Sequence, residues 1–111
     1  MDRKFVENLG WKYSGNWANR DFYCIGEFQI IDHNDDWCIS RDEDWYAIDV
    51  DGEEILSEFT NLVKKYYEIY NDPENHTLAE AFKAKKSISN FYEVHGCKEK
   101  EEDFIRIFDE L

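Results

Sequence analysis

The longest regular pattern in the chain is a stripe of hydrophobic residues at helical spacing between residues 53 and 70. Its apolar positions recur at steps of one, three and four, as expected for a helix that lies on a sheet. They are Ile55, Leu56, Phe59, Leu62, Val63, Tyr66, Tyr67 and Tyr70. Asn71-Asp72-Pro73 then supplies a stop signal. The pattern predicts a long amphipathic helix over residues 53–70.

Alternating hydrophobic and polar residues before this helix predict an antiparallel sheet. Residues 22–31 are interpreted as one strand, with Gly26 marking a bulge or a close backbone approach. The polar run 32–36 forms a turn, and residues 37–41 and 45–50 form two further strands. Residues 11–21 are expected to form a loose hairpin or an ordered loop, with a turn at Gly15-Asn16. The result is a meander of three to four strands.

Shorter helical patterns occur at both ends of the chain. Residues 2–9 predict a helix that is closed by Gly10. Thr77 and Glu80 have the spacing of a capping box, which opens a helix that continues to about residue 86. Residues 87–95 fit both a helix and a strand, and we favour the helix; residues 98–111 predict a final helix. We therefore expect a single α+β domain over residues 1–111, with a small antiparallel sheet packed against the long helix and further C-terminal helices.

The composition supports a folded domain inside the cell. Of 111 residues, 42% are hydrophobic and 17% are aromatic, which is enough to form a core. No run approaches the roughly 20 apolar residues of a membrane span, and the first residues do not resemble a signal peptide. Cys24, Cys38 and Cys97 are odd in number and widely spaced, which is typical of reduced thiols. We expect a cytoplasmic protein that does not bind membranes.

Charge is distributed very unevenly along the chain. The net charge is −13, and residues 32–58 contain eleven acidic residues against one base, Arg41. A strongly acidic surface repels nucleic acid and attracts basic proteins. We therefore expect a basic protein partner, such as a nuclease or another nucleic-acid-binding enzyme, and no direct binding of nucleic acid. The predicted partner-binding residues are Asp35, Asp36, Asp42, Glu43, Asp44, Trp45, Asp49, Asp51, Glu53 and Glu54.

Each of these features also has a simpler interpretation. A block of like charges is often only a solvated face. However, adjacent like charges reduce stability, and a protein that needed only solubility could spread them. Trp37 and Trp45 each follow two acidic residues, so either ring is a candidate interface anchor or a core residue. Strand alternation places Trp45 outward, whereas for Trp37 we favour the core.

The sequence contains no pattern typical of a catalytic or metal site. Asp49 to Glu53 resembles the start of a calcium-binding loop, but the glycine is at the wrong position for an EF-hand. Cys24, Cys38, His95 and Cys97 include no paired C-x-x-C as zinc ligands. There is no glycine-rich phosphate loop and no motif around a nucleophile. We predict no enzyme activity, no cofactor and no metal; a metal-binding or small enzymatic domain remains an alternative, as does an acidic adaptor subunit.

These observations favour an acidic protein that inhibits a nucleic-acid-processing enzyme by covering its basic groove. In size, acidity and cysteine usage the chain resembles two groups of proteins. One is the bacterial immunity proteins, which neutralise a cognate nuclease toxin; the other is the phage-encoded DNA mimics and anti-CRISPR inhibitors. The resemblance concerns overall character and carries no functional residues over. Of the two, we favour an immunity protein, because a compact α+β domain with one acidic face needs only one tight partner.

Overall fold

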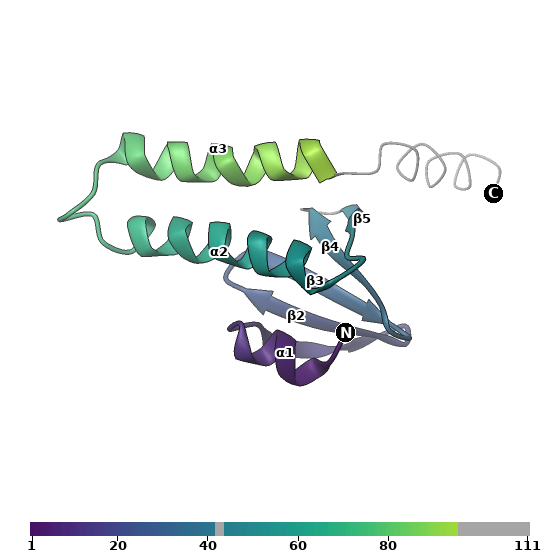
Figure 1. Ribbon diagram of the computed structural model, residues 1–111. Helices are drawn as coiled ribbons and strands as arrows, with labels where there is room; N and C mark the ends of the chain where they lie inside the picture. Colours follow the sequence, from purple (N-terminus) through teal and green to yellow (C-terminus); the bar gives the residue numbers. More distant parts are fainter. Residues whose placement is uncertain (42–43, 96–111) are drawn as a thin grey trace.

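The computed structural model describes residues 1–41 and 44–95, with the side chains of residues 41–47 left out of the description. It contains a five-stranded antiparallel sheet with strand order β1-β2-β3-β4-β5, and three helices (Figure 1). The elements are α1 (Arg3–Asn8), β1 (Lys12–Trp17), β2 (Arg20–Ile25), β3 (Phe28–His33), β4 (Asp36–Arg41), β5 (Asp44–Asp49), α2 (Glu53–Tyr70) and α3 (Leu78–His95). The predicted α+β class, with a meander sheet and a long helix, is confirmed.

The core lies between one face of the sheet and α2. Tyr23, Ile30, Ile39 and Ile48 occupy matching positions on four neighbouring strands, and all are buried. Leu56, Phe59 and Val63 from α2 belong to the same hydrophobic cluster, as the helical stripe predicts. The sheet and the helix therefore share one continuous apolar layer.

Trp11, which precedes β1, is held by the middle of α2. Its ring stacks on Phe59 at 6.0 Å between centroids, and its indole N–H donates to Thr60 Oγ1 at 2.8 Å. The Thr60 hydroxyl in turn donates to the Leu56 carbonyl oxygen at 2.6 Å. These buried polar groups are therefore satisfied within the core, which fixes the start of the sheet against the helix.

Two details of the predicted sheet are wrong. The single strand over residues 22–31 is a hairpin, because Gly26 and Glu27 form a turn between β2 and β3. A two-residue turn sets Ile25 opposite Phe28. The side chains that face the core therefore have odd residue numbers in β2 and even residue numbers in β3. In the same way, the first turn falls at Ala18-Asn19, whereas Gly15 lies beside a break in the β1–β2 register.

The helical predictions agree with the structure over the described residues. Thr77 Oγ1 accepts the Glu80 N–H at 3.2 Å, and α3 continues without a break through the stretch for which the pattern was ambiguous. α3 packs along α2, and the loop between them lies away from the sheet (Figure 1). Near its other end, Tyr92 donates to the Ser40 carbonyl oxygen at 2.9 Å. The helix predicted over residues 98–111 lies outside the described residues.

Candidate functional site

Three connections lie at the same end of the sheet: the β1–β2 turn, the β3–β4 turn and the β5–α2 loop. This follows from the meander, in which successive turns alternate between the two ends. The β3–β4 turn consists of Asn34 and Asp35, with φ angles of 52° and 66°. Asn and Asp tolerate this left-handed conformation better than other non-glycine residues, so the acidic sequence suits the turn itself.

Exposed carboxylates from these connections form what we call the acidic end. It consists of Asp35, Asp36, Asp51, Glu53 and Glu54, all of which are exposed. The Val50 N–H donates to the Trp37 carbonyl oxygen at 2.9 Å, which extends the pairing of β4 with β5 by one step. Asp36 and Asp51 therefore lie on adjacent chain segments, and Glu53 and Glu54 follow in the first turn of α2.

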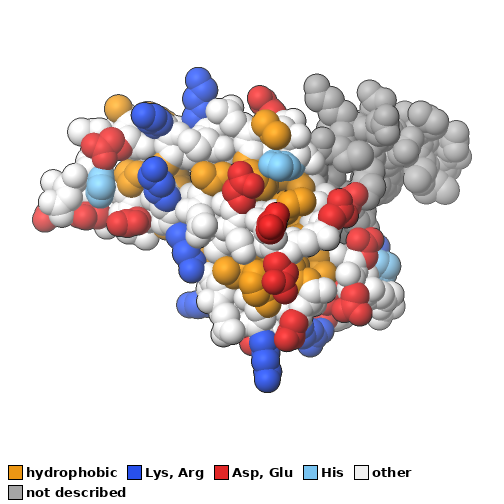
Figure 2. Space-filling view, viewed as in Figure 1, with side chains coloured by type: hydrophobic (Ala, Val, Ile, Leu, Met, Phe, Trp, Pro, Cys, Tyr) orange, Lys and Arg blue, Asp and Glu red, His pale blue; other side chains and the backbone are white. Residues whose placement is uncertain are grey.

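No base among the described residues neutralises the acidic end. Among the described residues, none of its five carboxylates forms an ion pair with Lys, Arg or His. Figure 2 shows Asp and Glu side chains spread over the sheet half of one face of the molecule. Such a group of uncompensated charges produces a negative potential that steers a basic partner toward it. Glu53 and Glu54 are in addition stabilised by the positive end of the α2 dipole.

Asp32 supports the turn that carries Asp35 and Asp36. Its Oδ1 accepts the Asp35 N–H at 2.9 Å, and the side chain is buried, with 8% of its surface exposed. Burial raises the pKa of Asp32, and the carboxylates of Asp35 and Asp21 raise it further, whereas the Asp35 N–H lowers it. The buried carboxylate therefore fixes the turn and at the same time adds negative charge behind the exposed ones.

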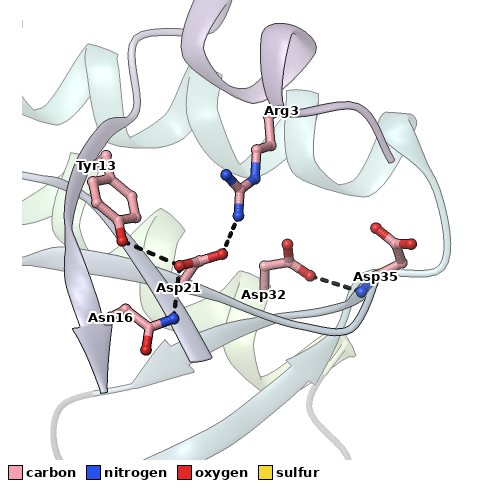
Figure 3. A network of polar contacts seen from close by, with 6 residues as sticks. All are labelled: Arg3, Tyr13, Asn16, Asp21, Asp32 and Asp35. Carbon is pink, nitrogen blue, oxygen red and sulfur yellow. Dashed lines mark hydrogen bonds and ion pairs between the residues drawn. The ribbon is translucent and has the colours of Figure 1, made fainter. Parts of the chain in front are cut away.

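Asp21, which faces Asp32 across the β2–β3 pair, has the opposite environment (Figure 3). Its carboxylate accepts hydrogen bonds from Asn16 Nδ2 at 2.9 Å and from the Tyr13 hydroxyl at 3.2 Å, and it forms an ion pair with Arg3. The hydrogen bond from Asn16 is the main cause of the lowered pKa of Asp21. Arg3 thus pairs with Asp21, and Figure 3 shows the guanidinium directed at that carboxylate and not at Asp35.

The other predicted site residues are less exposed or lie outside the described residues. Asp49 is half-buried in β5, opposite Cys38, so it contributes less to the exposed surface. Asp42 and Glu43 are outside the described residues, and for Asp44 and Trp45 only the backbone, in β5, is described. Trp37 has 2% of its surface exposed, which confirms its interpretation as a core residue.

Two residues at this end of the sheet were not predicted from the sequence. Trp17, the last residue of β1, has 61% of its surface exposed and belongs to the β1–β2 turn region. Exposed tryptophan is a frequent anchor of protein interfaces, and no charge pattern around Trp17 indicated this position. The supporting role of Asp32 was also missed, although Asp side chains near turns often accept a backbone N–H of the turn.

The described residues offer no group of three His, Cys, Asp or Glu side chains that could hold a metal ion. Of the candidate zinc ligands, Cys24 is partly exposed and Cys38 is buried, whereas Cys97 lies outside the described residues. Neither long helix, nor any other described helix, is long and apolar enough to cross a membrane.

Comparisons with protein-family models, with curated proteins and with solved structures found no match. The site is defined by its own geometry: an exposed acidic surface without ion pairs to described residues at one end of the sheet, with an exposed tryptophan at the same end.

Proposed function

We propose that this chain is an acidic binding protein that inhibits a nucleic-acid-processing enzyme by covering its basic groove. The leading form of this proposal is an immunity protein that neutralises a nuclease toxin in the cytoplasm. The observation that carries it is the acidic end, where five exposed carboxylates from neighbouring segments lack ion-pair partners among the described residues. A groove built to bind phosphates is lined by Lys and Arg, which such a surface complements.

The geometry also supports an apolar contribution to binding. Trp17 lies on the edge strand, and neighbouring strands are about 4.8 Å apart, so its position is within about 15 Å of β4. This distance is well within a protein interface of ordinary size. Charge would set the rate and orientation of association, and the ring would add contact area near the rim of the acidic end.

The test is a pull-down with matched charge variants. The native protein, an Asp36→Lys/Asp51→Lys variant and a Glu7→Lys/Glu74→Lys variant are tagged and used to capture partners from the lysate of the source cell. All four substituted residues are exposed, and both variants change the net charge equally. Asp35 is left unchanged, because lysine at its φ of 66° would strain the turn. Captured proteins are identified and titrated against each variant.

We expect the native protein and the Glu7/Glu74 variant to capture the same basic nucleic-acid enzyme and to inhibit it. The Asp36/Asp51 variant should bind it about tenfold more weakly or worse, since two attractive contacts become repulsive. A captured toxin nuclease supports the immunity function, whereas an RNA-guided effector supports the phage-inhibitor alternative. Equal binding by both variants would remove the acidic end from the mechanism, and capture of no basic enzyme by the native protein would overturn the proposal.

A further inference from the structure

A second surface, opposite in charge to the acidic end, lies between the two long helices. A cleft of about 260 Å³ separates α2 from α3 on one side of the hairpin. Figure 2 shows a band of hydrophobic side chains between these helices, with Lys side chains beside it toward the α2–α3 loop. The residues that line the cleft are Leu62, Lys65, Ile69, Glu80, Lys83, Ala84 and Ser87.

The cleft exists because α3 presents small side chains to this side of α2. Ala84 and Ser87 leave space that larger residues would fill, whereas Leu62 and Ile69 on α2 are only partly buried. On the core side of the same helix pair, packing is dense: the ring of Phe59 contacts those of Phe91 and Tyr92. The apolar floor of the cleft is therefore available for an added side chain.

Two lysines on opposite walls give the cleft its charge. Lys65 on α2 and Lys83 on α3 are exposed, and neither forms an ion pair with a described residue. The lining also includes one carboxylate, Glu80, whose Oε2 lies 2.7 Å from His76 Nδ1. Residues 61–87 carry five Lys against four acidic residues, in a chain whose net charge is −13. This part of the molecule thus reverses the general charge of the protein.

We propose that this cleft binds an acidic, amphipathic segment of a partner protein. An apolar side chain of the segment would lie on Leu62, Ile69 and Ala84, and carboxylates on either side of it would pair with Lys65 and Lys83. Helix-in-groove recognition places the apolar face of an amphipathic helix in such a groove. The observation that selects an acidic occupant is charge complementarity, since the two wall lysines have no described counter-ion. This site is separate from the acidic end and does not depend on its proposed function.

The experiment measures binding of a fluorescein-labelled, short helical peptide with Leu and Phe on one face and Glu on both sides of that face. The probe is titrated against the full chain by fluorescence anisotropy. A Lys65→Glu/Lys83→Glu variant should bind it about tenfold more weakly, because two attractions become repulsions. A Lys64→Glu/Lys86→Glu variant is the matched control: it has the same net charge, and its substituted lysines are exposed but do not line the cleft.

A second variant tests the apolar floor without changing charge. Ser87→Phe introduces a ring into the cleft and should weaken binding of the same probe, while circular dichroism confirms that the variant is folded. A probe with Lys in place of every Glu should not bind. The proposal is overturned if the acidic probe does not bind, or if the Lys64/Lys86 variant loses as much affinity as the Lys65/Lys83 variant. Neither result would bear on the acidic end, whose partner is basic.

Discussion

At the residue scale, the carboxylates of Asp21 and Asp32, which face each other across β2 and β3, should respond to pH in opposite directions. The pKa of Asp32 is raised, chiefly by burial, so the folded state favours its protonated form. Its contribution to stability is therefore complete below the ordinary carboxyl pKa of about 3.9 and is lost as the pH rises through the raised value. At neutral pH the charged Asp32 opposes folding, although it accepts the hydrogen bond that shapes the β3–β4 turn.

We expect Asp32→Asn to stabilise the protein at pH 7. The amide oxygen can still accept the Asp35 N–H, while the buried charge beside Asp35 and Asp21 is removed. The gain should be on the order of 1 kcal/mol, or several degrees in the melting temperature, and should disappear near pH 3. Thermal unfolding followed by circular dichroism at the two pH values measures it. A lower melting temperature at pH 7 would mean that the turn needs the charge itself.

Asp21→Asn provides the control with the opposite sign. The pKa of Asp21 is lowered, first by the hydrogen bond from Asn16. Its stabilising effect is present above the ordinary carboxyl pKa and is lost as the pH falls through the lowered value. The variant should therefore be less stable than the native protein at pH 7 and should approach it under strongly acidic conditions. If both variants shift stability in the same direction at pH 7, the local environments described here do not control these groups.

At the scale of elements, the turn between β2 and β3 fastens the sheet to α2. Tyr67 Oη accepts the Glu27 N–H at 2.8 Å, and Gly26 lies against the hydroxyl end of the Tyr67 side chain. A Cβ at Gly26 would be 2.1 Å from Tyr67 Oη, and the φ of 56° is also unfavourable for other residues. Only glycine therefore fits between the turn and the helix.

We expect Gly26→Ala to lower the free energy of unfolding by about 2–3 kcal/mol, because Tyr67 must move and the backbone is strained. Urea unfolding measures the change. Gly52→Ala is the comparison, since Gly52 has extended backbone geometry and a Cβ there would meet nothing within 4 Å. It should cost no more than about 1 kcal/mol through weaker helix capping. Equal losses in the two variants would show that the Gly26–Tyr67 contact does not constrain the fold.

The same turn explains why the helices were easier to predict from the sequence than the strands. The stripe from Ile55 to Tyr70 is long and periodic, and α2 has the predicted bounds. In contrast, residues 22–25 are all hydrophobic, so the pattern does not show that the core-facing positions change from odd to even numbers across the two-residue turn. Ala18, with a φ of 53°, is not a residue that signals a tight turn, which is why the β1–β2 turn was misplaced.

For the candidate site, the sequence indicated which charged residues are exposed, but it did not indicate which of them lie together in the fold. The turn composition around Asp35 and Asp36 correctly indicated exposed carboxylates, and the helix start did the same for Glu53 and Glu54. Asp51 lies beside Asp36 because β4 pairs with β5. This pairing extends to the backbone hydrogen bond between Val50 and Trp37. The cleft between Lys65 and Lys83 depends on how α2 and α3 pack, and sequence periodicity does not specify which lysines then face each other.

At the scale of the whole molecule, the acidic end should reduce stability through self-repulsion, and salt should relieve this. Its carboxylates lie close together without described ion pairs, in a protein of net charge −13. At about 0.01 M salt the Debye length is about 30 Å, so these repulsions act fully; at about 1 M it is about 3 Å, and they are screened. A local concentration of charge should therefore be more costly at low salt than the same charge placed elsewhere.

We accordingly expect the Asp36→Lys/Asp51→Lys variant to be more stable than the Glu7→Lys/Glu74→Lys variant at low salt, by about 0.5–1 kcal/mol. Both carry the same net charge, so a general reduction of charge cannot produce this difference. It should vanish near 1 M salt, where repulsion is screened. Urea unfolding of both variants across this range measures it. Equal stability at low salt would mean that the acidic end has no electrostatic cost, and one physical reason for regarding it as a binding surface would be lost.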